Sequence, residues 1–258
     1  MLFVGTSGWQ YRHWRGSFYP HKLAQRAWLE HFASRFQTAE VNNTFYNLPA
    51  ASVFKHWAER TPEDFVFALK VSRFLTHIRR LRDPEEPVEL FLDRARELGS
   101  KRGPSLIQLP PQMQVDTGRL DAVLSAFPAH DRVAVEFRHD SWFVPEVRSV
   151  LEKHGAALCL VDRKGMRTPR WQTADWGYVR FHQGRALPPS CYGRTALASW
   201  VDVVVEMWSR EADVFVYFNN DAFGCAVRDA IVFAHLAAER GLRPTRVGDT
   251  SDVTLGAA

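Results

Sequence analysis

The stretch AVEFRHDSW, residues 134–142, places charged side chains at the end of an apolar strand. The β-branched run at 132–135 is typical of a buried strand. Strand side chains alternate between two faces, so Glu136 and Arg138 share the face opposite Val135 and Phe137. In a closed barrel one face meets the surrounding helices and the other points inward. We therefore expect Glu136 and Arg138 to point into a barrel.

The same unit of a short apolar strand followed by a helical segment recurs eight times along the chain. Strands are predicted at 2–8, 39–45, 65–71, 105–109, 133–138, 157–162, 177–182 and 214–219. Helices are predicted at 24–36, 50–60, 87–98, 194–210 and 222–240, and after Asp116 and Pro145, whereas 163–175 has no clear helical pattern. Eight such units predict one (β/α)8 barrel domain over residues 1–258. A doubly wound sheet is the alternative, but GTSGWQYRHW after the first strand is no nucleotide-binding motif.

The composition is that of a globular protein. Hydrophobic residues make up 46% and charged residues 24% of the 258 residues. A net charge of +4 is too weak to predict nucleic-acid binding by itself. Three cysteines without a C-x-x-C pair predict reduced thiols and a cytoplasmic protein. Neither a secretory signal nor a membrane-spanning run is recognisable, so we expect no membrane partner.

Six of the predicted strands carry inward polar residues, mostly near their C-terminal ends. These are Glu40, Asn42, Thr44, Lys70, Gln108, Glu136, Arg138, Arg180, His182, Tyr217, Asn219 and Asp221. Active sites of this fold lie at that end of the barrel. Buried charges are costly unless they are paired, and a structural salt-bridge network among Glu40, Lys70, Glu136, Arg138 and Arg180 is the competing explanation.

The segments predicted to follow the strands are basic. They hold 14 Lys or Arg and 6 Asp or Glu, while the remainder of the chain is slightly acidic. A basic rim attracts anionic ligands. The last two of these segments, with Asn220 and Asp221 before the final helix, match the usual phosphate site of the fold. Aromatic residues including Trp9, Tyr46 and Trp142 accompany them, either to stack on a ligand or to close the barrel mouth.

These residues also carry a family resemblance that extends over nearly the whole chain. The motifs are GTSGWQYRHWRGSFYP at 5–20, FQTAEVNNTFYNLP at 36–49, FVFALKVSRFLTH at 65–77, GPSLIQLPPQ at 103–112, VEFRHDSW at 135–142, YVRFHQGR at 178–185 and VYFNNDAFGCAVRDA at 216–230. The chain resembles the YecE-like family of unknown function. The resemblance implies a TIM barrel and no particular activity. One departure is Gln183, which separates His182 from Gly184, where the family has His followed directly by Gly.

The favoured function is an enzyme for an anionic substrate, either a small phosphate-bearing molecule or a nucleic acid. Glu136 and Glu40 would act as general acid or base, and Lys70, Arg138, Arg180 and His182 would stabilise negative charge. Substrate would be positioned by Asn42, Gln108, Asn219, Asn220, Asp221, Trp9, Tyr46 and Trp142. A divalent metal on Glu40, Glu136, Asp162, His182 and Asp221 is one option for a cofactor.

Three other functions remain open. Lys70 at a strand end fits a Schiff-base lyase. The basic, aromatic rim fits a nucleic-acid-binding protein without enzymatic activity. A glycosidase needs two carboxylates across a sugar bond, for which Glu40 and Glu136 qualify, although a basic rim argues against a neutral sugar.

Overall fold

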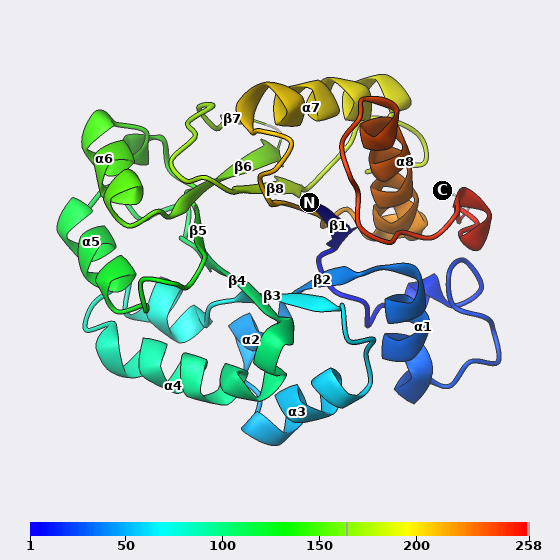
Figure 1. The fold of residues 1–258 in the computed structure, drawn as a ribbon, viewed down its shortest axis with the longest axis horizontal. Helices are drawn as coiled ribbons and strands as arrows, with labels where there is room; N and C mark the ends of the chain where they lie inside the picture. The colour runs from blue at the N-terminus through cyan, green and yellow to red at the C-terminus, as the bar shows by residue number, and fades with distance from the viewer. Residues whose placement is uncertain (164, 257–258) are drawn as a thin grey trace.

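A computed structural model describes residues 1–163 and 165–256, and eight of its strands form a closed parallel barrel (Figure 1). In barrel order these are β5 (Val133–Glu136), β4 (Arg102–Gln108), β3 (Val66–Lys70), β2 (Thr38–Val41), β1 (Leu2–Thr6), β9 (Val214–Phe218), β8 (Gly177–Phe181) and β6 (Ala157–Arg163). The pairing of β5 with β6 closes the ring. A short strand, β7 (Met166–Arg167), adds antiparallel to β6. The predicted TIM barrel is confirmed.

Helices surround the barrel and connect its strands. They are α1 (Trp28–Arg35), α2 (Asn43–Tyr46), α3 (Ala51–Glu59), α4 (Glu85–Ala95), α5 (Thr117–Ser125), α6 (Pro145–Lys153), α7 (Arg194–Met207) and α8 (Cys225–Glu239). Short 3₁₀ segments lie at Arg12–Trp14, Gln25–Ala27, Arg96–Lys101, Asp140–Trp142, Ala222–Gly224 and Thr250–Asp252, with one π-helical turn at Phe74–Ile78.

Local sequence explains where several helices begin and end. Asp116 caps α5, because its side chain accepts a hydrogen bond from Arg119 N at 3.0 Å. Pro145 is the first residue of α6, a position where its missing N–H costs nothing. Gly241 follows α8 with a φ of 78°, the left-handed conformation that ends many helices.

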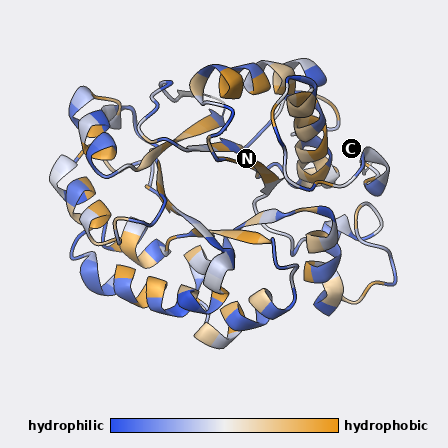
Figure 2. Ribbon diagram, in the orientation of Figure 1, coloured by the Kyte–Doolittle hydropathy of each residue, from blue (hydrophilic) through white to orange (hydrophobic). Residues whose placement is uncertain are grey.

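The strands separate two apolar layers. Their outward side chains, such as Val4, Val135 and Val216, pack against the helices. The inward side chains form a second cluster that fills the lower barrel: Ala68, Leu106, Ala134, Ala157, Cys159, Val161, Trp176, Tyr178, Phe215 and Tyr217. Figure 2 shows α8 as hydrophobic along most of its length, in agreement with the burial of most of its residues. The polar inward residues therefore lie above an apolar plug.

The second strand is shorter than the sequence predicts. It ends at Val41 rather than Phe45, and residues Asn43–Tyr46 form α2 instead. Thr44 Oγ1 donates to Lys70 O at 2.7 Å and to Val41 O at 3.0 Å, which holds this turn against β3. Asparagine disfavours strands, and two of them interrupt this one. Strand alternation predicts that Phe45 faces the outer helices. Because the strand ends at Val41, Phe45 instead contacts Lys70.

The cysteine prediction was wrong for two of the three residues. Cys191 and Cys225 form a disulfide with a Cα–Cα distance of 4.9 Å, whereas Cys159 is free and buried. The disulfide joins the segment after β8 to the first residue of α8 across 34 positions of sequence. No local spacing signals such a pair. In the described parts of the chain, we find no helix with the length and apolar character needed to cross a membrane.

Candidate functional site

A buried arginine joins two buried carboxylates above the apolar plug. β8 points Arg180 inward, and its Nη2 donates to Glu40 Oε1 of β2 at 2.7 Å. Its Nη1 donates to Glu136 Oε2 of β5. Tyr178 OH donates to Glu40 Oε2 at 2.7 Å. The three charged side chains are at most 1% exposed, so this pairing offsets the cost of removing them from water.

Arg138 and Gln108 complete the upper side of this network. Arg138 Nε donates to Glu136 Oε1, so both oxygens of Glu136 accept from an arginine. Gln108 Oε1 accepts from Arg138 Nη2 at 3.1 Å and from Arg180 Nη1 at 3.2 Å. Burial opposes the ionisation of Glu136, but Arg180, His182 and Arg138 outweigh it and hold the pKa of Glu136 well below its usual range. Glu136 is thus an ionised carboxylate.

His182 lies at the edge of the network. Its Nε2 is 3.5 Å from Glu136 Oε1, and its Nδ1 is 3.2 Å from Asn219 Nδ2. With Asn219 as the donor, Nδ1 carries no proton, and the proton of the neutral ring is on Nε2. Burial, together with the charges of Arg180 and Arg138, lowers the pKa of His182 below its usual value. A neutral imidazole at pH 7 is the form that accepts a proton.

Lys70 is the one inward cation of the predicted set that stays outside the ion-pair network. Within the part of the chain that the structure describes, its ammonium makes no ion pair within 4.0 Å and no hydrogen bond. Instead, Nζ lies 4.1 Å from the centre of the Phe45 ring, a cation–π contact. Burial, followed by the charge of Arg180, lowers the pKa of Lys70 to about 8. The pairing of Lys70 with Glu40 or Glu136, the alternative considered from sequence, is therefore absent among the described residues.

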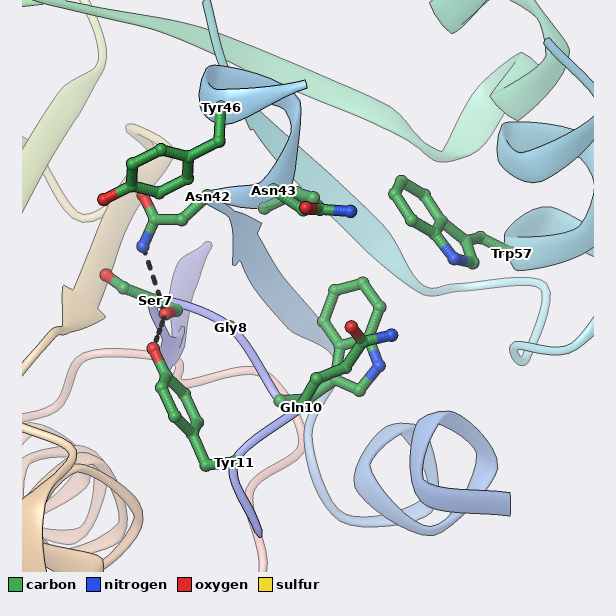
Figure 3. A pocket seen from close by; sticks show the side chains of 10 residues that line it. Ser7, Gly8, Gln10, Tyr11, Asn42, Asn43, Tyr46 and Trp57 are labelled. Atoms are coloured by element: carbon green, nitrogen blue, oxygen red, sulfur yellow. Dashed lines mark hydrogen bonds between the residues drawn. The ribbon is translucent and has the colours of Figure 1, made fainter. Parts of the chain in front are cut away.

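A pocket of about 210 Å³ opens beside this cluster, between the segments that follow β1 and β2 (Figure 3). It contains three residues predicted to bind substrate: Trp9, Asn42 and Tyr46. Tyr46 is 76% exposed, whereas Trp9 is buried against Trp57 and Phe67. Asn42 Nδ2 donates to Ser7 O at 3.2 Å.

The structure does not bring every predicted residue to this site. Trp142 is fully buried, stacks on Phe137 and donates to Met113 O at 2.7 Å, because its strand-end position packs it under the helices. Asn220 donates to the buried Asp229 at 2.7 Å and to Ser190 O, which ties it to α8. Both side chains are held by packing and hydrogen bonds away from the polar cluster.

Asp221 and Asp162 also point elsewhere. Asp221 lies 3.3 Å from His13 Nε2, and its backbone carbonyl accepts from Trp14 Nε1, so it fastens the segment after β1. Asp162 accepts a hydrogen bond from Trp200 of α7 at 3.1 Å, on the outer face of the barrel. Burial raises the pKa of both carboxyl groups.

The residues do not fit the metal site considered from sequence. Its five candidate ligands do not converge. Asp162 faces α7 and Asp221 faces His13, while Arg180 donates a hydrogen bond to one oxygen of each glutamate. No group of three or more His, Cys, Asp or Glu side chains converges as a metal site within residues 1–163 and 165–256. Lys164, which contributes to the basic segments, lies outside the described residues.

The phosphate site predicted at the start of α8 is closed. Cys225, Ala226 and Val227 are fully buried, and the disulfide holds the segment after β8 over this helix end. Gly184 N donates to Ser190 O in this segment, and a side chain on Gly184 would meet Cys191 O at 2.0 Å. The inserted Gln183 donates its N–H to Tyr192 OH at 3.1 Å. A phosphate has no access to the first turn.

Sequence reasoning missed several residues of the site. Tyr178 precedes Arg180 by two positions on the same inward face, and the alternation rule alone would have placed it there. Ser7, Gln10, Asn43 and Trp57 line the pocket, but they come from three separate segments and have no common spacing. Only the folded barrel brings them together.

The geometry defines a TIM-barrel protein with a buried, arginine-linked carboxylate pair and, at the C-terminal mouth, a buried lysine that forms no ion pair with the described residues. A family model described as "Protein of unknown function DUF72" matches residues 3–250, and the chain belongs to this family.

Relatives and solved structures agree with this membership. UPF0759 protein YunF of Bacillus subtilis is 25% identical over 88% of this chain and 91% of its own length. UPF0759 protein YecE of Escherichia coli K12 is 30% identical over 55% of this chain and 50% of its own. A crystal structure of a DUF72 family protein from Thermotoga maritima has a TM-score of 0.82 at 29% identity, covering 92% of this chain and 99% of that one. An Enterococcus faecalis DUF72 structure, at 20% identity and a TM-score of 0.76, covers 92% of this chain and 96% of that one and shares the fold.

Proposed function

We propose that the protein is an enzyme that binds an anionic substrate at the mouth of the barrel, with Lys70 and Arg138 as its cationic ligands. The observation that carries this proposal is the Lys70 ammonium, which is buried and has no counter-ion within 4.0 Å among the residues that the structure describes. Lys70, Arg138 and Arg180 supply three positive charges against the two of Glu40 and Glu136. A bound anion would neutralise the remaining charge in a site of low dielectric, where such contacts are strong.

The contacts favour a division of roles that differs from the one expected from sequence. Glu136 is fully buried and accepts from two arginines, so it is better suited to holding Arg138 and Arg180 in place than to carrying a proton. His182 is partly accessible, with 12% of its side chain exposed, and neutral at pH 7. We assign it the acid–base role, with Glu136 orienting its ring.

Burial of the aromatic residues favours a small molecule over nucleic acid. Trp14, Tyr19, Trp142 and Tyr192 are each at most 3% exposed and so are not available to stack on bases. The remaining polar mouth suits one phosphate or carboxylate group. A cytoplasmic location for such an enzyme remains a prediction.

Anion binding tests the proposal. Calorimetry at pH 7 with inorganic phosphate and sugar phosphates should detect binding that Lys70→Met weakens about tenfold or more, the value of one charged hydrogen bond. Affinity should fall as pH rises through about 8, because Lys70 loses its proton there. Lys153→Met, which removes an equal charge from the exposed surface of α6, is the control. Equal affinities for wild type and Lys70→Met would reject the proposal.

The lowered pKa of Lys70 favours a second function, a Schiff-base lyase. A neutral Nζ would add to a substrate carbonyl carbon, loss of water from that adduct would leave an imine, and uptake of a proton would convert the imine to the iminium ion. Borohydride reduction in the presence of pyruvate or dihydroxyacetone phosphate should then add the mass of the reduced ligand to wild type and not to Lys70→Met. No added mass with either carbonyl compound would count against this function.

A further inference from the structure

The pocket beside the polar cluster contains no charged side chain. Its lining is Ser7, Gly8, Trp9, Gln10, Tyr11, Val41, Asn42, Asn43, Tyr46 and Trp57. Its volume of about 210 Å³ is below the roughly 300–1,000 Å³ of pockets for whole drug-sized ligands. There is space for one ring of a larger ligand.

Two buried polar atoms on one side of the pocket have no partner. Ser7 Oγ and Asn42 Oδ1 are inaccessible and make no hydrogen bond to the described residues. The other groups here are engaged, because Asn42 Nδ2 and Tyr11 OH both donate to Ser7 O, at 3.2 and 2.6 Å (Figure 3). Asn42 Oδ1 therefore needs a donor, and buried polar groups are seldom left without one. A ligand O–H or N–H group would supply it once a covering side chain turns aside, and the exposed Tyr46 of this pocket is free to do so.

The opposite side is aromatic. Trp57 lies across the pocket from Asn42 and Tyr46, and Trp9 packs edge-on against Trp57 with ring centres 5.6 Å apart (Figure 3). Gly8, which also lines the pocket, has a φ of 109°, a conformation that favours glycine, and a Cβ there would lie 3.1 Å from Tyr11 Oη. Trp9 and Trp57 are buried at 3% and 6% exposure, so the ring of this pocket that is open to a ligand is Tyr46, 76% exposed. An aromatic face of this kind binds a flat, uncharged ring by stacking.

The helical turn α2 links this pocket to Lys70. Phe45 lies beneath the Lys70 ammonium, and its neighbour Tyr46 lines the pocket, with the two rings 5.0 Å apart. Asn42 directly follows β2, two residues after Glu40, which accepts from Arg180. One ligand can therefore place an anionic group at Lys70 and a ring in the pocket.

We propose that the pocket is a subsite for an uncharged ring bearing O–H or N–H donors, a sugar or a nucleobase, on the same ligand whose anionic group binds Lys70 and Arg138. This inference rests on the proposed function and adds the substrate class to it. The enzyme would discriminate ring-bearing phosphates from inorganic phosphate.

The test compares anionic probes on the full-length protein by calorimetry: inorganic phosphate, glucose 6-phosphate, adenosine 5′-monophosphate and uridine 5′-monophosphate. At least one ring-bearing phosphate should bind about tenfold or more tightly than inorganic phosphate, as expected for one stacked ring. Tyr46→Ala and Asn42→Ala should each reduce that preference, the ratio of the two affinities, severalfold. Tyr46 is 76% exposed, so its removal loses little buried surface, which keeps the test valid if Asn42→Ala is unstable.

Asn47→Ala, at the end of α2 and outside this pocket, is the matched control and should keep the preference. The probe that binds most tightly identifies the ring as a sugar or a nucleobase. If inorganic phosphate binds through Lys70 but no ring-bearing phosphate binds more tightly, the subsite is rejected and the proposed function stands. If no anion binds in a Lys70-dependent way, both are rejected, even where a neutral ring alone occupies the pocket.

Discussion

Two lysines of this protein are equally buried but differ in their hydrogen bonds. Lys70 and Lys101 are each 7% exposed. Lys101 Nζ donates to Ala58 O at 2.6 Å and to Thr61 O at 2.8 Å, and so joins the end of α3 to the segment before β4. Lys70 Nζ lies 4.1 Å from the centre of the Phe45 ring and makes no hydrogen bond within residues 1–163 and 165–256. Burial alone therefore does not mark a functional lysine, whereas burial without an acceptor does, because such a charge is costly for the fold.

The largest expected effect concerns the network that Lys70 does not join. Arg180→Met leaves Glu40 and Glu136 buried without their shared partner and should reduce the free energy of unfolding by about 3–5 kcal/mol. Urea unfolding measures this loss. Arg148→Met, which breaks an exposed pair with Glu152, should change stability by less than about 0.5 kcal/mol.

A combined Arg180→Met and Glu40→Gln variant sharpens this result. It removes the carboxylate that Arg180→Met leaves without an arginine, while Glu136 keeps its pair with Arg138, so it should be more stable than Arg180→Met alone. A loss below about 1 kcal/mol in Arg180→Met would contradict a buried ion-paired network.

The second effect is the contribution of Lys70 to the pH dependence of stability. Its pKa is about 8 in the folded protein against 10.5 ordinarily. Between these values the unfolded chain holds a proton that the folded protein does not, so stability rises with pH across this window. The total is on the order of 3 kcal/mol. Denaturation at pH values from 7 to 11 gives the free energy of unfolding of wild type and of Lys70→Met. The difference between the two proteins should change with pH by this amount in favour of wild type, and a difference that is the same at every pH would refute the prediction.

The third effect compares the two lysines directly. Lys101→Met leaves two buried carbonyl groups without a donor and should cost about 2 kcal/mol of stability. Lys70→Met removes a charge without an acceptor and should leave the midpoint of thermal unfolding at pH 7 unchanged or raise it. Differential scanning calorimetry measures the unfolding midpoint of each variant. Equal losses of stability in Lys101→Met and Lys70→Met would mean that Lys70 has an acceptor that the structure does not contain.

Strand alternation was sufficient to predict which side chains enter the barrel. It placed Glu136, Lys70 and Arg180 inward from the apolar residues around them, and the register of a parallel barrel brings their strands' C-terminal ends together. It did not reveal which carboxylate pairs with which cation, because Glu40 and Arg180 are 140 residues apart. Pairing depends on distances across the barrel, which periodicity does not contain.

Local sequence also failed wherever a connecting segment folded back on itself. Asn42 and Asn43 ended a strand that the pattern continued to Phe45, which moved Phe45 under Lys70. Trp142 resembled a rim aromatic but stacks on Phe137 in the packing layer. Cys191 and Cys225 pair only because the segment after β8 covers the start of α8. In each case a tertiary contact overrode the local pattern.

The pKa of Lys70 is the most direct test of the central claim that this lysine is buried without a counter-ion. The chain has six lysines, so a ¹³C-lysine NMR titration resolves each of them, and the Lys70→Met variant assigns the signal. We predict one ammonium that titrates near pH 8 and is absent from Lys70→Met. Titration of all six near the ordinary value of about 10.4 would show that Lys70 has a partner or is exposed to water, and would contradict the account.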